Sequence, residues 1–412
     1  MMNRQQFLAV AVAMLLAAMP AFAAKREREA PPPKKPVAAA PAVKKDEGPV
    51  SAPHAILIDA KNGNVLFERN ADQLIYPASL AKLMTVEYVL HLIKEGKLKL
   101  TDQFVVSENA WRKGGAPSHS STMFAALHSE VDVDDLLHAV IIQSANDACI
   151  VLAEGIAGTE ADFAAKLTQR AREIGLEKSV FTNSNGLPDP GTKVTTRELA
   201  MLARSIIVNY PDFYPIFAQT EFTWNKIRQQ NRNPLLPLGI GADGLKTGFT
   251  NEAGYGLVGS AVQNGLRLIA VVNGEKTAKE RAEEGKKLLE WGFHNFEERV
   301  LFAEGQTIGY AKVFGGASGS VPLEPTSPVR IMVPKAGGDK IVARIVYTGP
   351  VPAPVTEGTP VGALKVWRND NVVLSQPLKT AGSVPRGNLS QRAMDAVTEM
   401  VIGLFRAGAE RL

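Results

Sequence analysis

A serine and a lysine three residues apart form the first pattern in this sequence that predicts chemistry. Ser79 and Lys82 stand at the start of SLAKLMTVEYVLHLI, whose apolar residues predict a helix over 80–95. Residues three apart share a helix face, so we expect the hydroxyl and the amine to lie close together. Burial among apolar side chains, and the positive end of the helix dipole, both disfavour a charged lysine. A neutral Lys82 would be a base that activates Ser79 as a nucleophile.

This S-x-x-K pattern is weak when taken alone. At ordinary residue frequencies, roughly one or two matches are expected by chance in a chain of this length. A purely structural interpretation is also available, in which Ser79 caps the helix and Lys82 extends its amine to water. Other motifs are therefore needed before a nucleophile can be assigned.

A K-T-G motif, Lys246-Thr247-Gly248, is the second such pattern. It occurs once in the chain, whereas about 0.1 occurrences are expected by chance. The segment 255–274 that follows reads as a hairpin turning at Asn264-Gly265, so we expect the motif itself on a strand. A glycine on a strand allows a substrate to approach the backbone closely.

An S-x-N motif, Ser144-Ala145-Asn146, is the third. It interrupts the strongly apolar stretch IIQSANDACIVLAEGI, where buried polar side chains need partners that a functional site would supply. The chain has a second match, Ser107-Glu108-Asn109, which we interpret as a helix cap. We therefore favour Ser144 and Asn146 as site residues.

Composition and motif searches exclude several classes of function. The chain has 412 residues, 45% of them hydrophobic and 21% charged, which is typical of a globular protein. Its net charge of +4 is too small to indicate nucleic acid as a partner. One cysteine, Cys149, excludes an internal disulfide and a Cys-based zinc cluster, and we interpret it as a small buried apolar residue. Six scattered histidines suggest no metal site. The glycines of Gly254-x-Gly256-x-x-Gly259 fall in a hairpin strand, so no nucleotide cofactor is predicted.

The elements that would position these motifs predict an α+β fold. Within 51–298, the segment around Asn62-Gly63 reads as a hairpin, and helical periodicity follows over 80–95, 133–156, 160–174 and 276–291. Strands at both ends with helices between them indicate an antiparallel sheet covered by helices. From 299 to 385, short alternating runs divided by glycine and proline predict a small all-β domain.

The two ends of the chain differ from these domains. Residues 1–23 combine Arg4, an apolar run of about 13 residues and Ala21-Phe22-Ala23, as a cleaved signal peptide does, and the run is shorter than the ~20 residues that span a bilayer. Residues 24–50 are rich in proline and lysine and read as a linker. Residues 386–412 predict an amphipathic helix. Its pattern alone leaves open whether it lies on a membrane or docks on its own domain or a partner.

The order S-x-x-K, S-x-N, K-T-G resembles that of penicillin-binding proteins and β-lactamases, with Ala145 where S-D-N has aspartate. The likeness is greatest to the D-alanyl-D-alanine carboxypeptidases among the low-molecular-mass penicillin-binding proteins, and it covers nearly all of 51–412. The segments that carry it are PASLAKLMT, SENAW, QSANDACIVLAE, NRNPLL, DGLKTGFTNEAGY and EGQTIGYAKV. The resemblance implies a β-lactamase/transpeptidase-like catalytic domain.

The resemblance also implies a role for each motif. Ser79 would be the acylated nucleophile and Lys82 its base. Ser144 would relay a proton to the leaving group, and Asn146 would hold the substrate amide. Lys246 would add positive potential. Thr247 and, less directly, Arg232 would face the terminal carboxylate of the substrate. Backbone N–H groups of Ser79 and Phe249 would form the oxyanion hole. Phe249 stands where members of the family often have histidine.

The function implied is that of a serine carboxypeptidase that removes the terminal D-alanine from peptidoglycan stem pentapeptides through an acyl-enzyme. It would need no metal or cofactor, and penicillins and other β-lactams would acylate it. In the family, the terminal helix attaches the periplasmic enzyme to the outer face of the inner membrane. An endopeptidase that cuts cross-links uses the same motifs and remains an alternative, as does a penicillin-binding scaffold with little turnover. A β-lactamase is disfavoured, because we find no clear glutamate for deacylation.

Overall fold

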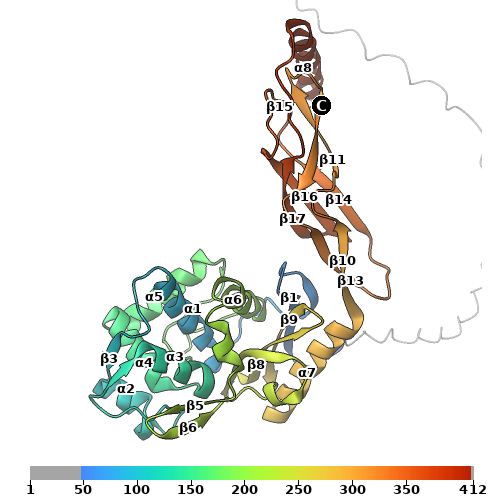
Figure 1. Cartoon of the computed structure of the whole chain (residues 1–412). Coiled ribbons are helices and arrows are strands. Elements are labelled where there is room, and N and C mark those ends of the chain that lie inside the picture. The colour runs from blue at the N-terminus through green and yellow to red at the C-terminus, as the bar shows by residue number, and fades with distance from the viewer. Residues whose placement is uncertain (1–47, 410–412) are drawn as a thin grey trace, which may run out of the picture. The chain divides into compact units, whose positions relative to one another are not determined.

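The computed structural model describes residues 48–409, which form an α+β body, a β domain and a C-terminal helix (Figure 1). The signal peptide expected over 1–23 lies outside the described residues, as does nearly all of the linker expected over 24–50. The α+β class predicted from the sequence is confirmed.

A five-stranded antiparallel sheet, in the order β2-β1-β9-β8-β7, forms the centre of the body. Both expected hairpins are present, and Asn264 and Gly265 take the positive φ angles of 51° and 77° that a two-residue turn requires. The first strand pairs with the last, with Ile56 opposite Val271. The strands are β1 (His54–Asp59), β2 (Val65–Arg69), β7 (Ala242–Thr250), β8 (Gly254–Gln263) and β9 (Leu266–Glu275).

The apolar side chains of the sheet alternate between its two faces, and both faces are covered. Ile56 and Val258 belong to the core beneath most of the helices, whereas their neighbours Leu57 and Leu257 pack with Leu288 of α7 (Ala278–Asn295). All five side chains are fully buried. Burial of each is worth about 1.5–3 kcal/mol. The result is a layer of helices, a sheet and a single covering helix (Figure 1).

The layer of helices agrees with the sequence prediction except at one place. The prediction of one continuous helix over 133–156 is wrong. The chain forms α3 (Val133–His138) and a π-helical turn (Ala139–Gln143), and the helix is then interrupted at Ser144, whose φ is 65°. The other helices are α1 (Lys82–Lys94), α2 (Glu108–Lys113), α4 (Asn146–Ala157), α5 (Glu160–Glu173) and α6 (Thr196–Asn209). Two small antiparallel strand pairs were not predicted: β3 (Gln103–Val105) with β4 (Glu130–Asp132), and β5 (Glu221–Trp224) with β6 (Ile227–Gln230).

The β domain contains a two-stranded sheet and a six-stranded sheet of order β14-β16-β17-β12-β11-β15. Its own core includes Leu323, Val366 and Leu378, all of them fully buried. The paired strands of the small sheet are β10 (Phe296–Phe302) and β13 (Val329–Pro334). The larger sheet contains β11 (Gly309–Phe314), β12 (Ser320–Pro325), β14 (Ile341–Val346), β15 (Val351–Pro352), β16 (Pro360–Arg368) and β17 (Asn371–Thr380).

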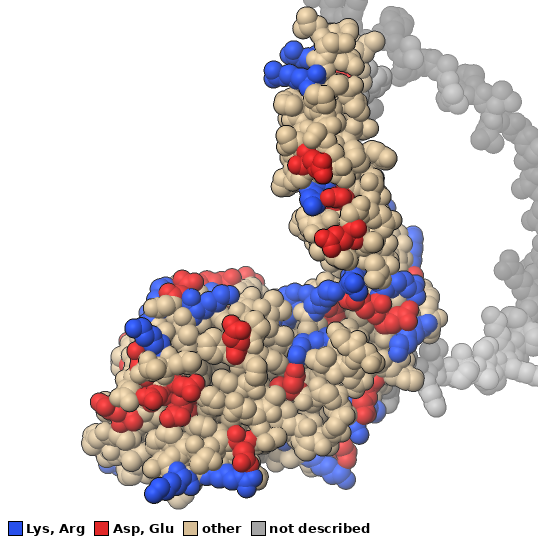
Figure 2. Space-filling view, viewed as in Figure 1, with Lys and Arg blue, Asp and Glu red and all other residues tan. Residues whose placement is uncertain are grey.

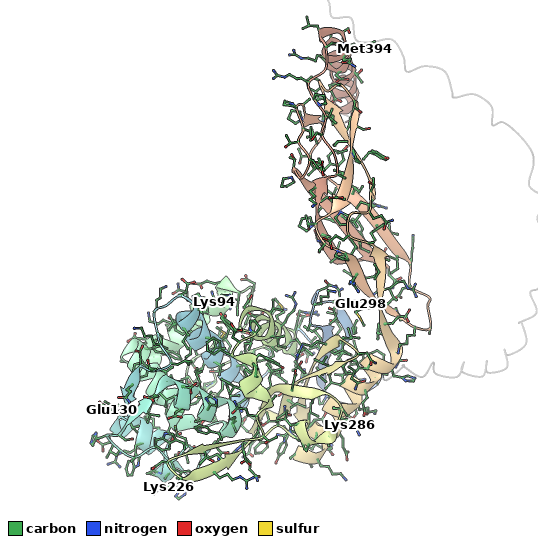
Figure 3. All side chains as sticks on the ribbon, viewed as in Figure 1. Lys94, Glu130, Lys226, Lys286, Glu298 and Met394 are labelled. Atoms are coloured by element: carbon green, nitrogen blue, oxygen red, sulfur yellow. The ribbon has the colours of Figure 1, made fainter. Side chains whose placement is uncertain are left out.

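The C-terminal helix α8 (Leu389–Ala409) packs on this domain through its polar face. Asp395 accepts a hydrogen bond from the backbone N–H of Gly315 at 2.7 Å, and Glu399 pairs with Lys312 of β11 at 2.7 Å. Apolar side chains of the helix are left exposed: Leu389, Met394, Val397 and Met400 (Figure 3 labels Met394). Within residues 48–409, no helix has the length and apolar character needed to cross a bilayer.

Acidic and basic side chains are intermixed on the face of the body that Figure 2 presents. This distribution offers no broad patch of one sign there.

Candidate active site

The turn before α1 places the serine and the lysine of the first motif side by side. Ser79 lies in a 3₁₀ turn, η1 (Ala78–Ala81), and Lys82 is the first residue of α1. The Lys82 Nζ atom is 3.0 Å from the Ser79 Oγ atom. Ala78 holds a left-handed φ of 48°, a conformation that costs a non-glycine residue about 1–2 kcal/mol. Strain of this kind, next to a candidate nucleophile, is typical of functional sites.

A loop that contains Asn185 and Gly186 packs against this turn, and the sequence reasoning missed it. Gly186 approaches so closely that a Cβ atom on it would lie 1.9 Å from the carbonyl oxygen of Ala78. The adjacent carbonyl of Asn185 accepts a hydrogen bond from Lys82 Nζ at 2.6 Å. The Asn- and Gly-rich run TNSNGL predicts a turn but carries no sign that its backbone serves a lysine.

Lys82 is fully buried, in agreement with the burial expected from its apolar surroundings in the sequence. The pKa of Lys82 is lowered to about 8, mainly because the amine is buried. The charge of Arg232 contributes to this lowering, and the charge of Asp147 opposes it. At pH 7, about one molecule in ten then carries a neutral amine, against fewer than about one in a thousand for an ordinary lysine. The neutral amine keeps a donor for Asn185 and has a lone pair for the Ser79 proton.

The S-x-N motif forms a second wall at the break between α3 and α4. Ser144 is buried in its left-handed conformation, and Asn146 is the first residue of α4. The Asn146 Nδ2 atom donates to Ser120 Oγ at 2.9 Å, while its buried Oδ1 atom has no hydrogen-bond partner among the described residues. Such an atom costs about 1–3 kcal/mol. A substrate amide is a group that could supply the missing bond.

Asp147, which the sequence reasoning also missed, fastens this wall to the neighbouring loop. Its buried carboxylate accepts hydrogen bonds from Thr122 Oγ1 at 2.6 Å and from the N–H groups of Met123 at 3.0 Å and Ala125 at 3.3 Å. Burial raises the pKa of Asp147, and these donors oppose that shift. An aspartate inside an apolar stretch was the available signal, since a buried carboxylate requires several donors.

The K-T-G motif lies on β7, the edge strand of the sheet, as predicted. Lys246 and Thr247 are both buried, and Lys246 Nζ donates to the Thr247 carbonyl at 3.1 Å. Burial, then the charges of Lys82 and Arg232, hold the pKa of Lys246 well below its usual range. The lowered pKa makes the charged form of Lys246 less favourable than that of an exposed lysine. A carboxylate bound beside Lys246 would favour its charged form.

Gly248 has a role in packing besides the substrate contact expected from the sequence. A Cβ atom at this position would lie 3.0 Å from the carbonyl oxygen of Pro77 and 3.1 Å from the N atom of Leu80. The glycine therefore allows β7 to pack directly against the turn that carries Ser79. Close approach of a substrate to its backbone was the sequence expectation.

Phe249 and Arg232 lie near the ends of these walls. Phe249 is 47% exposed and stacks on Tyr255, with ring centroids 4.1 Å apart. Arg232 donates to Ser121 Oγ at 2.9 Å and to Gln143 Oε1 at 3.3 Å, which ties it to the loop beside the S-x-N motif.

The arrangement is suited to nucleophilic acyl transfer, because it joins a hydroxyl, a lysine of lowered pKa and an edge strand with free backbone groups. Cys149 is fully buried, and burial raises its pKa to about 12, so its thiol stays protonated. No cluster of histidine, cysteine and carboxylate side chains among residues 48–409 is arranged to hold a metal ion.

Two family profiles match the chain. Residues 39–277 match the family described as D-alanyl-D-alanine carboxypeptidase, and residues 296–386 match the C-terminal domain of penicillin-binding protein 5. A D-alanyl-D-alanine carboxypeptidase of Escherichia coli is 39% identical over 345 residues, which are 83% of this chain and 86% of that protein.

Solved structures of penicillin-binding proteins are also similar to this chain. The crystal structure of penicillin-binding protein 5 from Haemophilus influenzae is 37% identical, with a TM-score of 0.73 over 82% of this chain and 98% of that one. Penicillin-binding protein D2 from Listeria monocytogenes, in its ampicillin-bound form, is 32% identical, with a TM-score of 0.54 over 59% of this chain and 98% of that one.

Proposed function

The chain belongs to the D-alanyl-D-alanine carboxypeptidase family, and on that premise we propose that it removes the terminal D-alanine from peptidoglycan stem pentapeptides through an acyl-enzyme on Ser79. The observation that carries this proposal is the distance of 3.0 Å between Lys82 Nζ and Ser79 Oγ, with the lysine fully buried. A hydroxyl is a poor nucleophile at neutral pH unless a base of suitable pKa adjoins it.

Acylation begins when neutral Lys82 takes the proton of Ser79. The Ser79 Oγ atom attacks the carbonyl carbon of the penultimate D-alanine, and the oxyanion is stabilised by the N–H groups of Ser79 and Phe249. The C–N bond then breaks as Ser144 passes its proton to the leaving nitrogen and regains a proton from Lys82, which becomes neutral again. Free D-alanine departs, and the rest of the peptide remains as an ester on Ser79.

Binding of the substrate uses the two walls beside Ser79. Thr247 and Lys246 on β7 hold the terminal carboxylate, with support from Arg232. Asn146 hydrogen-bonds the peptide on the opposite side, where one of its amide atoms is unpartnered. Water hydrolyses the ester and restores the serine. The same groups accept a penicillin, as in the ampicillin-bound relative.

Release of D-alanine from a synthetic peptide ending in D-Ala-D-Ala tests the activity directly. We expect release by the wild-type chain and at least about 10³-fold less by the Ser79→Ala variant. Release by that variant at the wild-type rate would refute the nucleophile. Retained penicillin acylation with no D-alanine release, but with cleavage of cross-linked dimers, would support the endopeptidase alternative.

Export and membrane attachment are part of the proposal. Residues 1–23 direct export to the periplasm, residues 51–298 form the catalytic domain, 299–385 the β domain, and 386–412 the membrane-attaching helix. Support for the last assignment comes from α8, which packs by its polar face and leaves Leu389, Met394, Val397 and Met400 exposed, at 81%, 71%, 58% and 66%. An exposed apolar face of this kind suits the outer face of the inner membrane.

Sedimentation with vesicles of phosphatidylethanolamine and phosphatidylglycerol tests the attachment. We expect the full chain to sediment with them, and a chain ending at 388 to stay in solution. The V397S/M400S variant should lose part of the binding while keeping its peptidase rate. Equal sedimentation of all three would contradict a membrane role for the helix.

A further inference from the structure

A cluster of partly buried polar side chains joins three strands of the sheet at the start of β7, and none of the roles assigned above uses it. Arg267 of β9 donates to the two carboxylate oxygens of Asp243, at 2.8 Å and 2.7 Å, and to Ser260 Oγ of β8 at 2.8 Å. The Tyr214 hydroxyl donates to Asp243 Oδ1 at 2.9 Å. Asp243 stands three residues before Lys246, so the cluster fixes the part of β7 that leads into the K-T-G motif.

The buried residue Tyr214 belongs to a 3₁₀ turn, η4 (Tyr214–Ala218), which packs directly against β7. Gly244 makes this contact possible, because a Cβ atom there would lie 2.5 Å from the Tyr214 hydroxyl oxygen and 3.5 Å from the Phe217 Cβ atom. The rings of Tyr214 and Phe217 stack, with centroids 5.5 Å apart. The strand β7 therefore rests on η4 at Gly244 and on the turn that carries Ser79 at Gly248.

The same turn η4 is also joined to the S-x-N wall. It packs against the π-helical turn that ends directly before Ser144. The Asn231 Nδ2 atom donates to the Phe217 carbonyl at 3.2 Å, and the backbone N–H of the next residue, Arg232, donates to the Ile142 carbonyl at 3.3 Å. The turn η4 therefore contacts both sides of the site, the K-T-G strand on one side and the support of the S-x-N wall on the other.

We propose that Tyr214 is a positioning residue of this site. Its hydroxyl fixes β7 on η4, and η4 in turn sets the separation between β7 and the S-x-N wall. The proposed substrate spans this separation, because its terminal carboxylate contacts Thr247 and its amide contacts Asn146. A displacement of about 1 Å caused by a change outside the reacting groups can cost about 10²-fold in rate. This inference rests on the proposed function, since that function assigns both substrate contacts.

Two substrates separate positioning from folding in the Y214F variant, which loses only the hydroxyl. An acyl-D-Ala-D-Ala peptide carries the terminal carboxylate, whereas the p-nitrophenyl ester of the same acyl-D-alanine has the same reacting carbonyl without that carboxylate. We expect kcat/KM to fall by about five- to twentyfold for the peptide, which is the scale of one lost hydrogen bond, and by less than about threefold for the ester. A variant that merely lowers the folded fraction would reduce both by the same factor.

Y210F is the matched control, because Tyr210 takes part in the same kind of cluster elsewhere in the body. Its hydroxyl donates to Glu87 Oε1 at 3.0 Å, and the same oxygen accepts from Arg170 at 3.0 Å. That cluster includes no residue of β7 or of η4, so the ratio of the peptide rate to the ester rate should equal that of the wild type. Hydrogen exchange of residues 242–250 should quicken in Y214F and stay unchanged in Y210F.

The outcomes separate the two proposals. D-alanine release by the wild type, with a peptide-to-ester ratio that is the same in the wild type and in Y214F, overturns the positioning role and leaves the carboxypeptidase activity standing. Unchanged hydrogen exchange of residues 242–250 in Y214F also overturns it. If the wild type releases no D-alanine from the peptide, the proposed function fails, and the positioning role fails with it.

Discussion

Acylation of Ser79 should depend on pH through Lys82, because the base must lose its proton before it can accept another. The lysine is fully buried and its pKa is lowered to about 8. The neutral fraction is then about 0.1 at pH 7, 0.5 at pH 8 and 0.9 at pH 9. The second-order rate constant for acylation should therefore rise about tenfold from pH 7 to a plateau above pH 9.

Stopped-flow acylation by a fluorescent penicillin between pH 6 and pH 10 measures this constant. The carboxylate of the penicillin stays ionised throughout, and the Cys149 thiol, with a pKa of about 12, does not titrate in this range. Circular dichroism at each pH confirms that the fold is intact. A rate that is level from pH 6 to pH 9, or that falls with rising pH, would refute Lys82 as the base.

A second variant tests the cause of the shift. The charge of Arg232 helps to lower the pKa of Lys82, so R232Q should move the midpoint of the profile to higher pH, whatever it does to the plateau. A midpoint that moves to lower pH would contradict the electrostatic part of the reasoning.

Three further substitutions test the surroundings of the site. F249H places an imidazole with a pKa near 6.5 beside the reacting carbonyl. The acylation rate of this variant, divided by that of the wild type, should therefore change between pH 5.5 and pH 7.5. A constant ratio would oppose a role for this position. D147N replaces one carboxylate oxygen, which accepts hydrogen bonds from two donors, by an NH2 group that must face them, so urea unfolding should show a loss of about 2–4 kcal/mol. An unchanged midpoint would refute the fastening role. G186A adds a Cβ atom 1.9 Å from the Ala78 carbonyl oxygen. G239A is the control, because its φ is also left-handed but the space around it is open, and its free energy of unfolding should fall by about 1–2 kcal/mol. G186A should lose more than this. Equal losses for these two glycine variants would show that Gly186 does not support the turn.

Sequence reasoning reached the chemistry of the site because that chemistry lies in short local motifs. Ser79 and Lys82 are three residues apart, so helix geometry alone brings them together. The hairpin turns and the strand position of Lys246 were predictable for the same reason, since each depends on neighbouring residues. The apolar pattern indicated that Lys82 is buried, but it did not show that the backbone at Asn185, about a hundred residues away, accepts a hydrogen bond from the amine.

What the sequence did not predict depends on contacts between distant segments. Ser144 breaks a region whose apolar periodicity continues through it, so the two helices were read as one. The donors that surround Asp147 come from a loop more than twenty residues earlier. The reason for Gly248 lies in the turn at Pro77, which only the assembled sheet brings against it.

The site of the covalent adduct with a penicillin tests the central claim most directly. Intact mass followed by peptide mapping should find one penicilloyl group per chain, on the peptide that contains Ser79, and none on the Ser79→Ala variant. An adduct of the same mass on any other residue, or an equal yield with the variant, would contradict the assignment of Ser79 as the nucleophile that Lys82 activates.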